Sequence, residues 1–264
     1  MFECVLQIMQ LALRHTHVIP RWTRVHSTLL PKDPGSVKIY RLRVIHIQEA
    51  DWQLLNKMIV ARDVIRHADT EQVLHPDQGS GPGKMTIDLA INNVAEYEYL
   101  RMAVQNGAVL YNDATACYDR LIENFSNMAL TAHGCPPDVL ALHAAVTQHM
   151  HYHVITDYGV ADSFIQSTPT TPLYGAGQGS TDAPARFQCV SSCTMRAYDK
   201  LATGVEMTSP LQDQTVMHRA NMFVDDNQSI TPVLQHDTPE DIGRKIASNA
   251  ATWEKTGMDD RWQA

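Results

Sequence analysis

Two adjacent aspartates constrain this chain more than any other feature of its sequence. Asp225 and Asp226 follow the apolar run Met222–Val224, and the polar Asn227 comes next. This pattern predicts a tight β-hairpin with two acids at its tip, where the turning backbone lets neighbouring side chains converge. Two such carboxylates repel each other unless a cation lies between them, and oxygen ligands suit Mg²⁺ or Mn²⁺. A solvated turn is the alternative, because Asp and Asn are common turn residues.

A third acid lies where it could join this pair. The apolar run Ala108–Tyr111 predicts a buried strand, and Asp113 follows just past its end. An acid at the end of a central strand can reach a metal ion held by acids on a neighbouring hairpin. Helix capping is the alternative role of Asp113, and we expect a structural role of this kind for Asp119.

Composition sets the class of protein. The chain has 264 residues, of which 44% are hydrophobic, enough for one large domain or two small ones. Its net charge is −8, yet segment 14–66 holds ten Lys or Arg against four acids. Basic residues are therefore concentrated locally. No membrane span or secretory signal is evident, so we expect an intracellular protein, nuclear or cytoplasmic, with reduced cysteines.

Basic and apolar residues alternate between Val37 and Ile45, which predicts an extended ribbon with Lys38, Arg41 and Arg43 on or beside it. Cations on such a strand can neutralise a triphosphate or a nucleic-acid backbone. A charged edge strand without a ligand is the alternative.

Two glycine-rich stretches fit no standard nucleotide-binding spacing. Loop 77–84 lacks the Gly-Lys-Ser or Gly-Lys-Thr ending of a Walker loop, and stretch 172–184 matches neither this motif nor Gly-x-Gly-x-x-Gly. The bare backbone of the second stretch would let another chain or a base approach closely. Alternating histidines in 149–153 lack an acid or cysteine at ligand spacing, so we expect them to have surface or packing roles.

Helices are expected on either side of these loops. Segments Ala185–Tyr198 and Thr238–Trp253 have helical patterns, and Thr86–Met102 is expected to form a helix that packs against a sheet. In that helix the following residues would lie on or near one face: Ile87, Ala90, Ile91, Val94, Tyr97 and Leu100.

In this order, the motifs resemble the fingers and palm of a reverse transcriptase, most closely those of the non-LTR retrotransposon and group II intron branch. Residues 111–120, which contain Asp113 and the pair Tyr-Asp, are similar to the first palm motif. Residues 178–184 resemble Gln-Gly-x-Pro-x-Ser-Pro, with Thr181 in place of the first proline, and 223–226 resemble the Phe-Ala-Asp-Asp box. Four upstream segments are similar to the fingers motifs: 30–32, 43–45, 54–57 and 77–86.

The resemblance implies an α+β chain with the right-hand architecture of a polymerase. Residues 1–105 would form a fingers-like region, and residues 106–264 a palm whose antiparallel sheet packs on helices. In this family a helical thumb normally follows the palm. The resemblance therefore implies a chain truncated before the thumb, with thumb and endonuclease regions belonging to a longer element protein. Without a thumb, nucleic-acid binding should be weak and salt-sensitive.

The resemblance also implies a reaction, RNA-directed DNA synthesis from an RNA template, a DNA primer and dNTPs. Asp113, Asp225 and Asp226 would hold two Mg²⁺ or Mn²⁺ ions that activate the primer hydroxyl and neutralise the leaving pyrophosphate.

Nucleotide contacts are implied for five further residues. Lys32 and Arg43 would meet the incoming triphosphate. Tyr118 would exclude a ribose 2′ hydroxyl, and so select deoxynucleotides. Gln178 and Gly179 would lie along the template strand and the new base pair.

Two alternatives stay open at the level of sequence. One is a truncated, non-catalytic reverse-transcriptase remnant with residual nucleic-acid binding. The other is an RNA-templated RNA polymerase, because the three acids serve that chemistry too.

Overall fold

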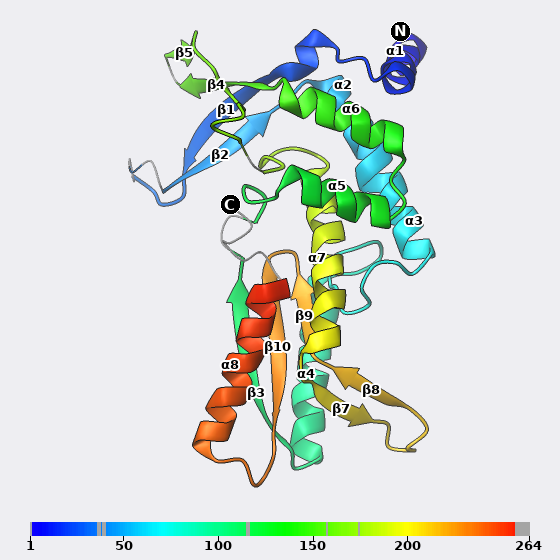
Figure 1. Cartoon of the computed structure of the whole chain (residues 1–264), viewed down its shortest axis with the longest axis vertical. Coiled ribbons are helices and arrows are strands. Elements are labelled where there is room, and N and C mark those ends of the chain that lie inside the picture. Colours follow the sequence, from blue (N-terminus) through cyan, green and yellow to red (C-terminus); the bar gives the residue numbers. More distant parts are fainter. Residues whose placement is uncertain are drawn as a thin grey trace. The chain divides into compact units, whose positions relative to one another are not determined.

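The computed structural model describes residues 2–35, 38, 41–114, 117–156, 158–173 and 175–256. Its helices and strands fall into two units, each built from two separate stretches of chain (Figure 1). Unit 1 comprises Met1–Thr70 and Ala116–Cys189, and unit 2 comprises Glu71–Thr115 and Val190–Ala264. The mixture of helices and sheets agrees with the prediction, and the division into fingers and palm at residue 105 stays a prediction.

Unit 1 contains a five-stranded sheet in the order β2-β1-β4-β5, with β6 also paired to β4. Its strands are β1 (Arg24–Pro31), β2 (Leu42–Ile47), β4 (His151–Thr156), β5 (Gly159–Val160) and β6 (Ile165–Gln166). β1 pairs antiparallel with β2 and parallel with β4. The predicted basic ribbon is β2 in part, and residues 36, 37, 39 and 40 lie outside the described residues.

Unit 1 contains several helices and a core with two tryptophans. The helices are α1 (Phe2–His15), the 3₁₀ helix η1 (Pro20–Thr23), α2 (Ala50–Asn56), the π-helical η3 (Lys57–Val64), α3 (Ile65–Thr70), α5 (Glu123–Ala132) and α6 (Pro137–Gln148). The rings of Trp22 and Trp52 lie 5.2 Å apart between centroids, and both side chains are buried. Val25, Leu142 and Met150 belong to the same cluster, so the core joins β1 to α2 and α6.

Three smaller predictions concern the histidines of β4, the cysteines and the presence of a membrane span. On β4, His151 and His153 pack against the ring of Phe164, with centroids 4.2 and 5.6 Å apart, which is the packing role expected of them. Within the described part of the chain, none of the five cysteines is bonded to another in a disulfide. Among the described residues, no helix combines the length and the apolar character needed to cross a membrane.

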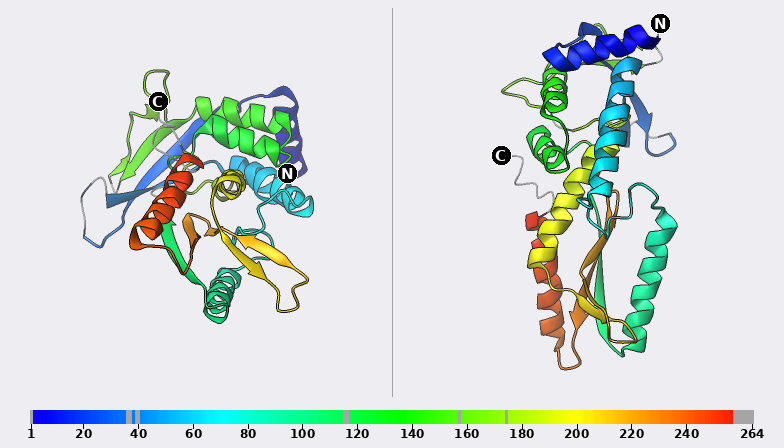
Figure 2. Two further views of the ribbon diagram at one scale, coloured as in Figure 1. Left: turned by 60° about the horizontal axis from the view of Figure 1, so that its bottom comes forward. Right: turned by 90° about the vertical axis from the view of Figure 1, so that its right-hand side faces the viewer.

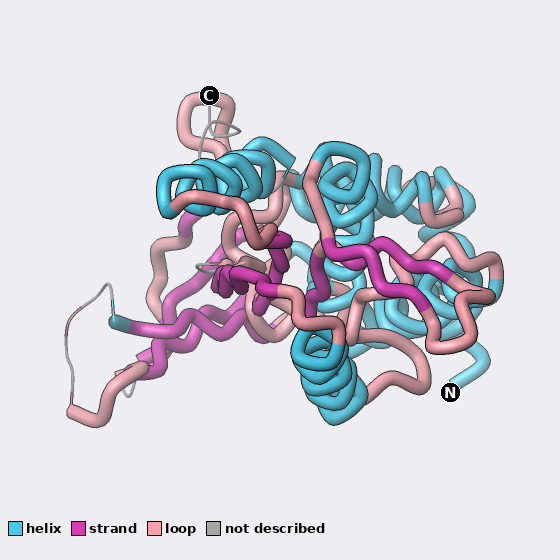
Figure 3. The backbone as a smooth tube through the Cα atoms, turned by 90° about the horizontal axis from the view of Figure 1, so that it is seen from below, coloured by secondary structure: helices cyan, strands magenta, loops and turns pink. Residues whose placement is uncertain are grey.

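Unit 2 is built on an antiparallel sheet in the order β3-β10-β9, formed by β3 (Asn106–Asp113), β9 (Ala220–Phe223) and β10 (Asp226–Val233). A separate hairpin pairs β7 (Val205–Thr208) with β8 (Thr215–His218), as Figure 3 shows. The long helix α7 (Ala183–Leu201) begins in a stretch of unit 1 and ends in unit 2.

Two helices cover the three-stranded sheet of unit 2. α4 (Thr86–Met102) and α8 (Pro239–Thr256) lie on its opposite faces (Figure 2). On α8, Asn249 Nδ2 donates to Thr231 Oγ1 at 2.8 Å, whereas Leu100 of α4 packs against Ile230. Because neighbouring strand residues face opposite ways, these two contacts fix one helix on each face.

Helix α4 forms where it was predicted, but its expected apolar face is not the one that packs. Ile87, Ile91 and Val94 are 56–60% exposed, whereas Glu96 and Leu100 are 4% and 8% exposed. The prediction of the packed face was therefore wrong for most of these residues.

Hydrogen bonds between polar side chains of α4 and the sheet explain this orientation of the helix. Asn221 Nδ2 of β9 donates to Asn93 Oδ1 at 2.6 Å, and Gln228 Nε2 of β10 donates to Glu96 Oε2 at 3.3 Å. Burial raises the pKa of Glu96, since a charged carboxylate loses hydration there. Apolar periodicity could not reveal this face, because its partners are polar strand residues far along the chain.

The two faces of α4 should differ in their effect on stability. Leu100→Ala should lower the free energy of unfolding by about 2–4 kcal/mol, because it opens a cavity against Ile230. Ile91→Ala, the matched control on the exposed face, should change it by less than about 0.5 kcal/mol. Urea unfolding of both variants measures this, and a larger loss for Ile91→Ala would contradict the orientation of the helix.

Candidate functional site

The acidic hairpin forms as the sequence predicts. β9 ends at Phe223 and β10 begins at Asp226, whose backbone pairs with Phe223 across the hairpin. Val224 and Asp225 make the two-residue turn, so one acid lies in the turn and the next begins the strand. Both are solvent-accessible, Asp226 more than Asp225.

Asp113 lies beside this pair. It is the last residue of β3, and its cross-strand neighbour on β10 is Asp226. The next amide, Ala114 N–H, donates to the Asp225 carbonyl at 3.1 Å. Directly opposed residues in an antiparallel pair point to the same face, with their Cβ atoms about 4.5–5.5 Å apart. Two exposed carboxylates therefore face the same side at the end of the sheet.

The turn itself is strained. Val224 has a φ of +54°, in the left-handed region that β-branched residues avoid. A positive φ at the first central position suits a tight hairpin, and glycine is the usual residue there. Backbone strain of this kind persists only where surrounding contacts hold it, and it is common at functional sites.

The buried side chain of Asn227 stabilises the acidic hairpin. Asn227 is 3% exposed; its Oδ1 accepts from Asn112 Nδ2 at 3.2 Å, and its Nδ2 donates to the Asn221 carbonyl at 3.1 Å. These bonds tie together all three strands one residue away from the acids. Asn227 was expected only as a turn residue, so this structural role was missed.

Loop 77–79 continues the sheet at the edge of β9. Met222 N–H donates to the Asp77 carbonyl at 3.1 Å, and Gly79 N–H donates to the Met222 carbonyl at 2.6 Å. A Cβ atom on Gly79 would lie 3.2 Å from the Phe223 ring, so the absence of a side chain permits this close approach. Gly79 thus lets this loop pack against the acidic hairpin.

The same loop is anchored on the C-terminal part of α7. His75 N–H donates to Ser192 Oγ at 2.8 Å, and the His75 ring bonds to Asp199 through Nε2 at 2.8 Å. His75 is 3% exposed, whereas the side chain of its partner Asp199 is 33% exposed.

The three acids fit a metal site only in part. Asp113 and Asp226 share a face and offer the oxygen ligands that Mg²⁺ prefers. Asp225 lies in the turn and is not gathered with them: within the described ranges, no three His, Cys, Asp or Glu side chains are placed to hold one ion.

The residues implied in nucleotide binding belong to unit 1. Gln178 and Gly179 lie in a loop on β2, where His46 N–H donates to the Gln178 carbonyl at 2.7 Å. Gly179 has a φ of +105°, and a Cβ atom there would lie 2.6 Å from the His46 carbonyl. Gln53 Nε2 of α2 donates to the Gly179 carbonyl at 3.0 Å. The backbone that lies close to Gly179 is therefore that of strand β2.

Tyr118 and Asp119 border the same loop. Gln178 Nε2 donates to Asp119 Oδ2 at 3.3 Å, and Ala176 N–H donates to the Tyr118 carbonyl at 2.9 Å. The Tyr118 ring packs edge-on against Phe187 of α7, with centroids 5.8 Å apart. Asp119 does not cap a helix, since α5 begins at Glu123. It orients the Gln178 side chain instead.

The two predicted cations are placed differently. Lys32 follows β1 directly and is exposed, and its N–H donates to the Arg41 carbonyl at 2.9 Å. Arg43 is the cross-strand neighbour of Leu30, and by alternation it lies on the face of β2 opposite to that of His46. The His46 side chain lies beside Gly177 of the loop, so Arg43 is on the other face of the sheet.

A cavity of about 280 Å³ opens beside this loop in unit 1. Its polar lining includes Asp119, His46 and Tyr152, and its apolar lining consists of Leu29, Val44, Val154, Ile165 and Leu173. Burial lowers the pKa of His46, with an opposing effect from Asp119, and raises the pKa of Tyr152 to about 12. At neutral pH both rings are uncharged, so the cavity suits a largely apolar group with a few hydrogen-bonding atoms.

The sequence matches no protein-family model and no curated protein. Solved structures do resemble it. Telomerase from Candida tropicalis with the TWJ fragment of telomeric RNA has a TM-score of 0.55 and 15% identity, over 91% of this chain and 40% of that one. Apo telomerase from the same organism has a TM-score of 0.56 and 14% identity, over 89% and 43%.

A third such structure is apo Candida tropicalis telomerase truncated from its C-terminal domain, with a TM-score of 0.51 and 15% identity over 91% and 49% of the two chains. The chain thus spans less than half the length of these telomerases. Telomerase is a reverse transcriptase, and the likeness shows that this chain has a reverse-transcriptase-like fold.

Proposed function

We propose that the chain carries out RNA-directed DNA synthesis, with Asp113, Asp225 and Asp226 as its catalytic, metal-binding acids. One observation carries the proposal: β3 and β10 pair so that Asp113 lies opposite Asp226, next to Asp225 in a strained turn. This arrangement occurs in a chain with a reverse-transcriptase-like fold. An acid pair opposed across a sheet is unfavourable without a cation, which supports a binding role.

In this proposal unit 2 is the palm and unit 1 supplies the fingers. Two Mg²⁺ or Mn²⁺ ions would lower the charge developing on the attacking and leaving oxygens of nucleotidyl transfer. The chain's own part is to hold the acids at the end of the sheet. Asn227 below and loop 77–79 beside the hairpin do so by direct hydrogen bonds.

The proposed partners are an RNA template, a DNA primer and dNTPs. Telomerase in complex with telomeric RNA supports RNA as a partner. Gln178 and Gly179 would contact the template and the new base pair, and Tyr118 would test the sugar. Lys32 would meet the triphosphate, whereas the position of Arg43 on the other sheet face suits a nucleic-acid phosphate.

The finer assignment to the non-LTR retrotransposon and group II intron branch rests on the order and residues of the sequence motifs. The thumb and endonuclease regions of a longer element protein belong to the same proposal. Neither affects the chemistry proposed for the three acids.

Metal binding should depend on Asp113. Without divalent ions, Asp113→Asn should raise the free energy of unfolding by about 0.2–1 kcal/mol, because it removes a like-charge pair across the sheet. Millimolar Mg²⁺ or Mn²⁺ should raise the melting temperature of the unaltered chain but not that of Asp113→Asn. Glu254→Gln, at an exposed position of α8, is the control and should keep the full metal response. Equal responses in all three proteins would contradict the site.

Primer extension tests the reaction itself. At low salt, with an RNA template, a DNA primer, dNTPs and Mg²⁺, Asp225→Asn should lower the product at least about 100-fold, a loss typical of removing a group that stabilises charge in the transition state. Glu254→Gln should extend as the unaltered chain does. If the folded chain gives no Asp225-dependent product, the enzyme proposal fails and the non-catalytic alternative stands.

Tyr118 should set the choice of sugar. Tyr118→Ala should allow ribonucleotides to be incorporated where the unaltered chain takes deoxynucleotides, because the ring no longer blocks the 2′ hydroxyl. Extension with dNTPs or with NTPs measures the ratio, and Tyr118→Phe should preserve it. An unchanged ratio in Tyr118→Ala would instead favour RNA-templated RNA synthesis.

A further inference from the structure

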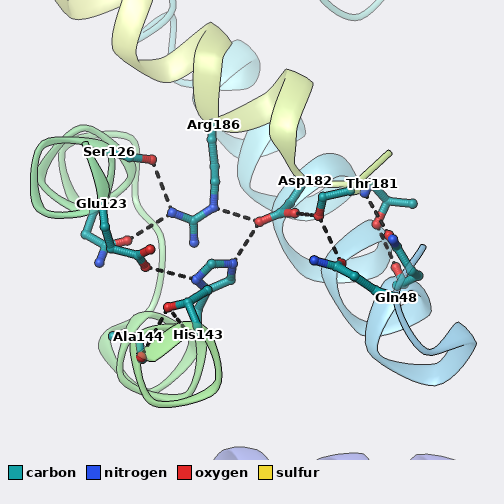
Figure 4. A network of polar contacts seen from close by, with 12 residues as sticks. Gln48, Glu123, Ser126, His143, Ala144, Thr181, Asp182 and Arg186 are labelled. Carbon is teal, nitrogen blue, oxygen red and sulfur yellow. Dashed lines mark hydrogen bonds and ion pairs between the residues drawn. The ribbon is translucent and has the colours of Figure 1, made fainter. Parts of the chain in front are cut away.

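The loop that carries Gln178 and Gly179 is held at its far end by a buried carboxylate. Asp182 is 1% exposed and lies just before α7 (Figure 4). It accepts hydrogen bonds from the Ser180 hydroxyl and from Arg186 Nε, the latter at 2.7 Å. Asp182 therefore fixes the end of the loop onto the first turn of the helix.

Thr181, the residue before Asp182, binds to α2. Its N–H donates to Gln53 Oε1 at 2.7 Å, and its hydroxyl donates to the Gln53 carbonyl at 2.8 Å. The loop is thus clamped between α2 and Asp182, and a displacement of Asp182 would disturb the backbone that continues into Gly179.

His143 of α6 bridges two carboxylates in this network. Its Nε2 lies 3.0 Å from Asp182 Oδ2, and its Nδ1 lies 3.2 Å from Glu123 Oε1 of α5. A neutral imidazole has one N–H and one lone pair, so it would turn the lone pair toward an anion. Only the imidazolium form donates to both acids.

The charges of the network then balance. Two carboxylates, Asp182 and Glu123, face two cations, His143 and Arg186, and Arg186 Nη1 also donates to Ser126 Oγ at 3.1 Å. Loss of the histidine proton would leave one uncompensated negative charge in a network in which Asp182, His143 and Arg186 are buried, and this is costly.

The network is not itself a place for a ligand. The cavity next to it has a volume of about 20 Å³, roughly the space of one water molecule. Its lining includes Glu123, His143, Ser180 and Arg186, together with the backbone of Gly175 and Gly177. The network therefore affects the loop by holding its backbone in place.

We propose that protonated His143 is a positioning residue that keeps the Gln178–Thr181 loop in its nucleic-acid-binding conformation by holding Asp182. The proposal rests on the proposed function for its biological meaning, because the loop is assigned there to the template. Its structural part, the link between His143 and the loop, is independent of catalysis.

The direction of the pH effect follows from the charges that face His143. Burial and Arg186 lower its pKa, but the bonds to Asp182 and Glu123 outweigh them, so that its pKa is raised. The stabilisation is then fully present below the ordinary histidine pKa of about 6.5 and is lost as pH rises through the raised value. The pKa values of Asp182 and Glu123 are lowered despite burial, so both acids stay charged over this range.

Two readouts test the proposal in the full chain. ¹⁵N NMR of the His143 ring should show both nitrogens protonated at pH 7. Hydrogen exchange of the Thr181 amide, relative to its intrinsic rate, should lose protection when the pH rises through the raised pKa of His143. The affinity for a single-stranded RNA oligonucleotide should fall over the same pH range.

Variants separate positioning from general stability. In His143→Gln the Thr181 protection and the RNA affinity should be low and independent of pH between pH 6 and 9. Glu123→Gln keeps His143 and Asp182, and it should shift the transition to lower pH. His149→Gln, an exposed histidine just after α6, is the control and should keep the unaltered profile.

The outcomes are decisive in both directions. A His143 ring with a single protonated nitrogen at pH 7, or a Thr181 pH profile unchanged in both His143→Gln and Glu123→Gln, would overturn the proposal. Asp225→Asn should retain the whole pH response. Failure of primer extension together with an intact Thr181 response would therefore refute the proposed function and leave the His143 link standing.

Discussion

The pairing of β3 with β10 is the interaction on which the acid-bearing unit depends. Asp113 and Asp226 oppose each other at one end of this ladder, where like charges disfavour the register by about 0.2–1 kcal/mol. Val109 opposes the buried Ile230 further along the same strands. A slip of one residue would turn Ile230 to the wrong face. The apolar core therefore fixes the register, and the opposition of the two acids follows from it.

A cation converts this unfavourable opposition into a binding interaction. The backbone contributes as well: Val224 is held at a positive φ, and the amide of Ala114 bonds to the carbonyl of Asp225, so that the third acid stays at the end of the sheet. Strain in the turn and charge repulsion across the strands are both costs that the core of unit 2 offsets. Such costs are typical of sites shaped for a ligand rather than for stability.

Local patterns predicted the parts of the site that depend on nearby residues. The Asp225-Asp226 hairpin and the strand ending at Asp113 follow from turn chemistry and apolar runs. Contacts between distant residues were missed. Asp182 and His143 are 39 positions apart in the chain. The local signal was the spacing of Asp182 and Arg186, which lie four residues apart where α7 begins and can form an ion pair. The packed face of α4 was misassigned for the same reason, since its partners are polar residues on β9 and β10.

The most direct test of the central claim is anomalous diffraction from crystals of the chain grown with Mn²⁺. The proposed function predicts an anomalous peak within coordination distance, about 2.2 Å, of carboxylate oxygens of Asp113 and of the Asp225-Asp226 pair. Mn²⁺ peaks elsewhere on the molecule, with none between β3 and the hairpin, would contradict the account.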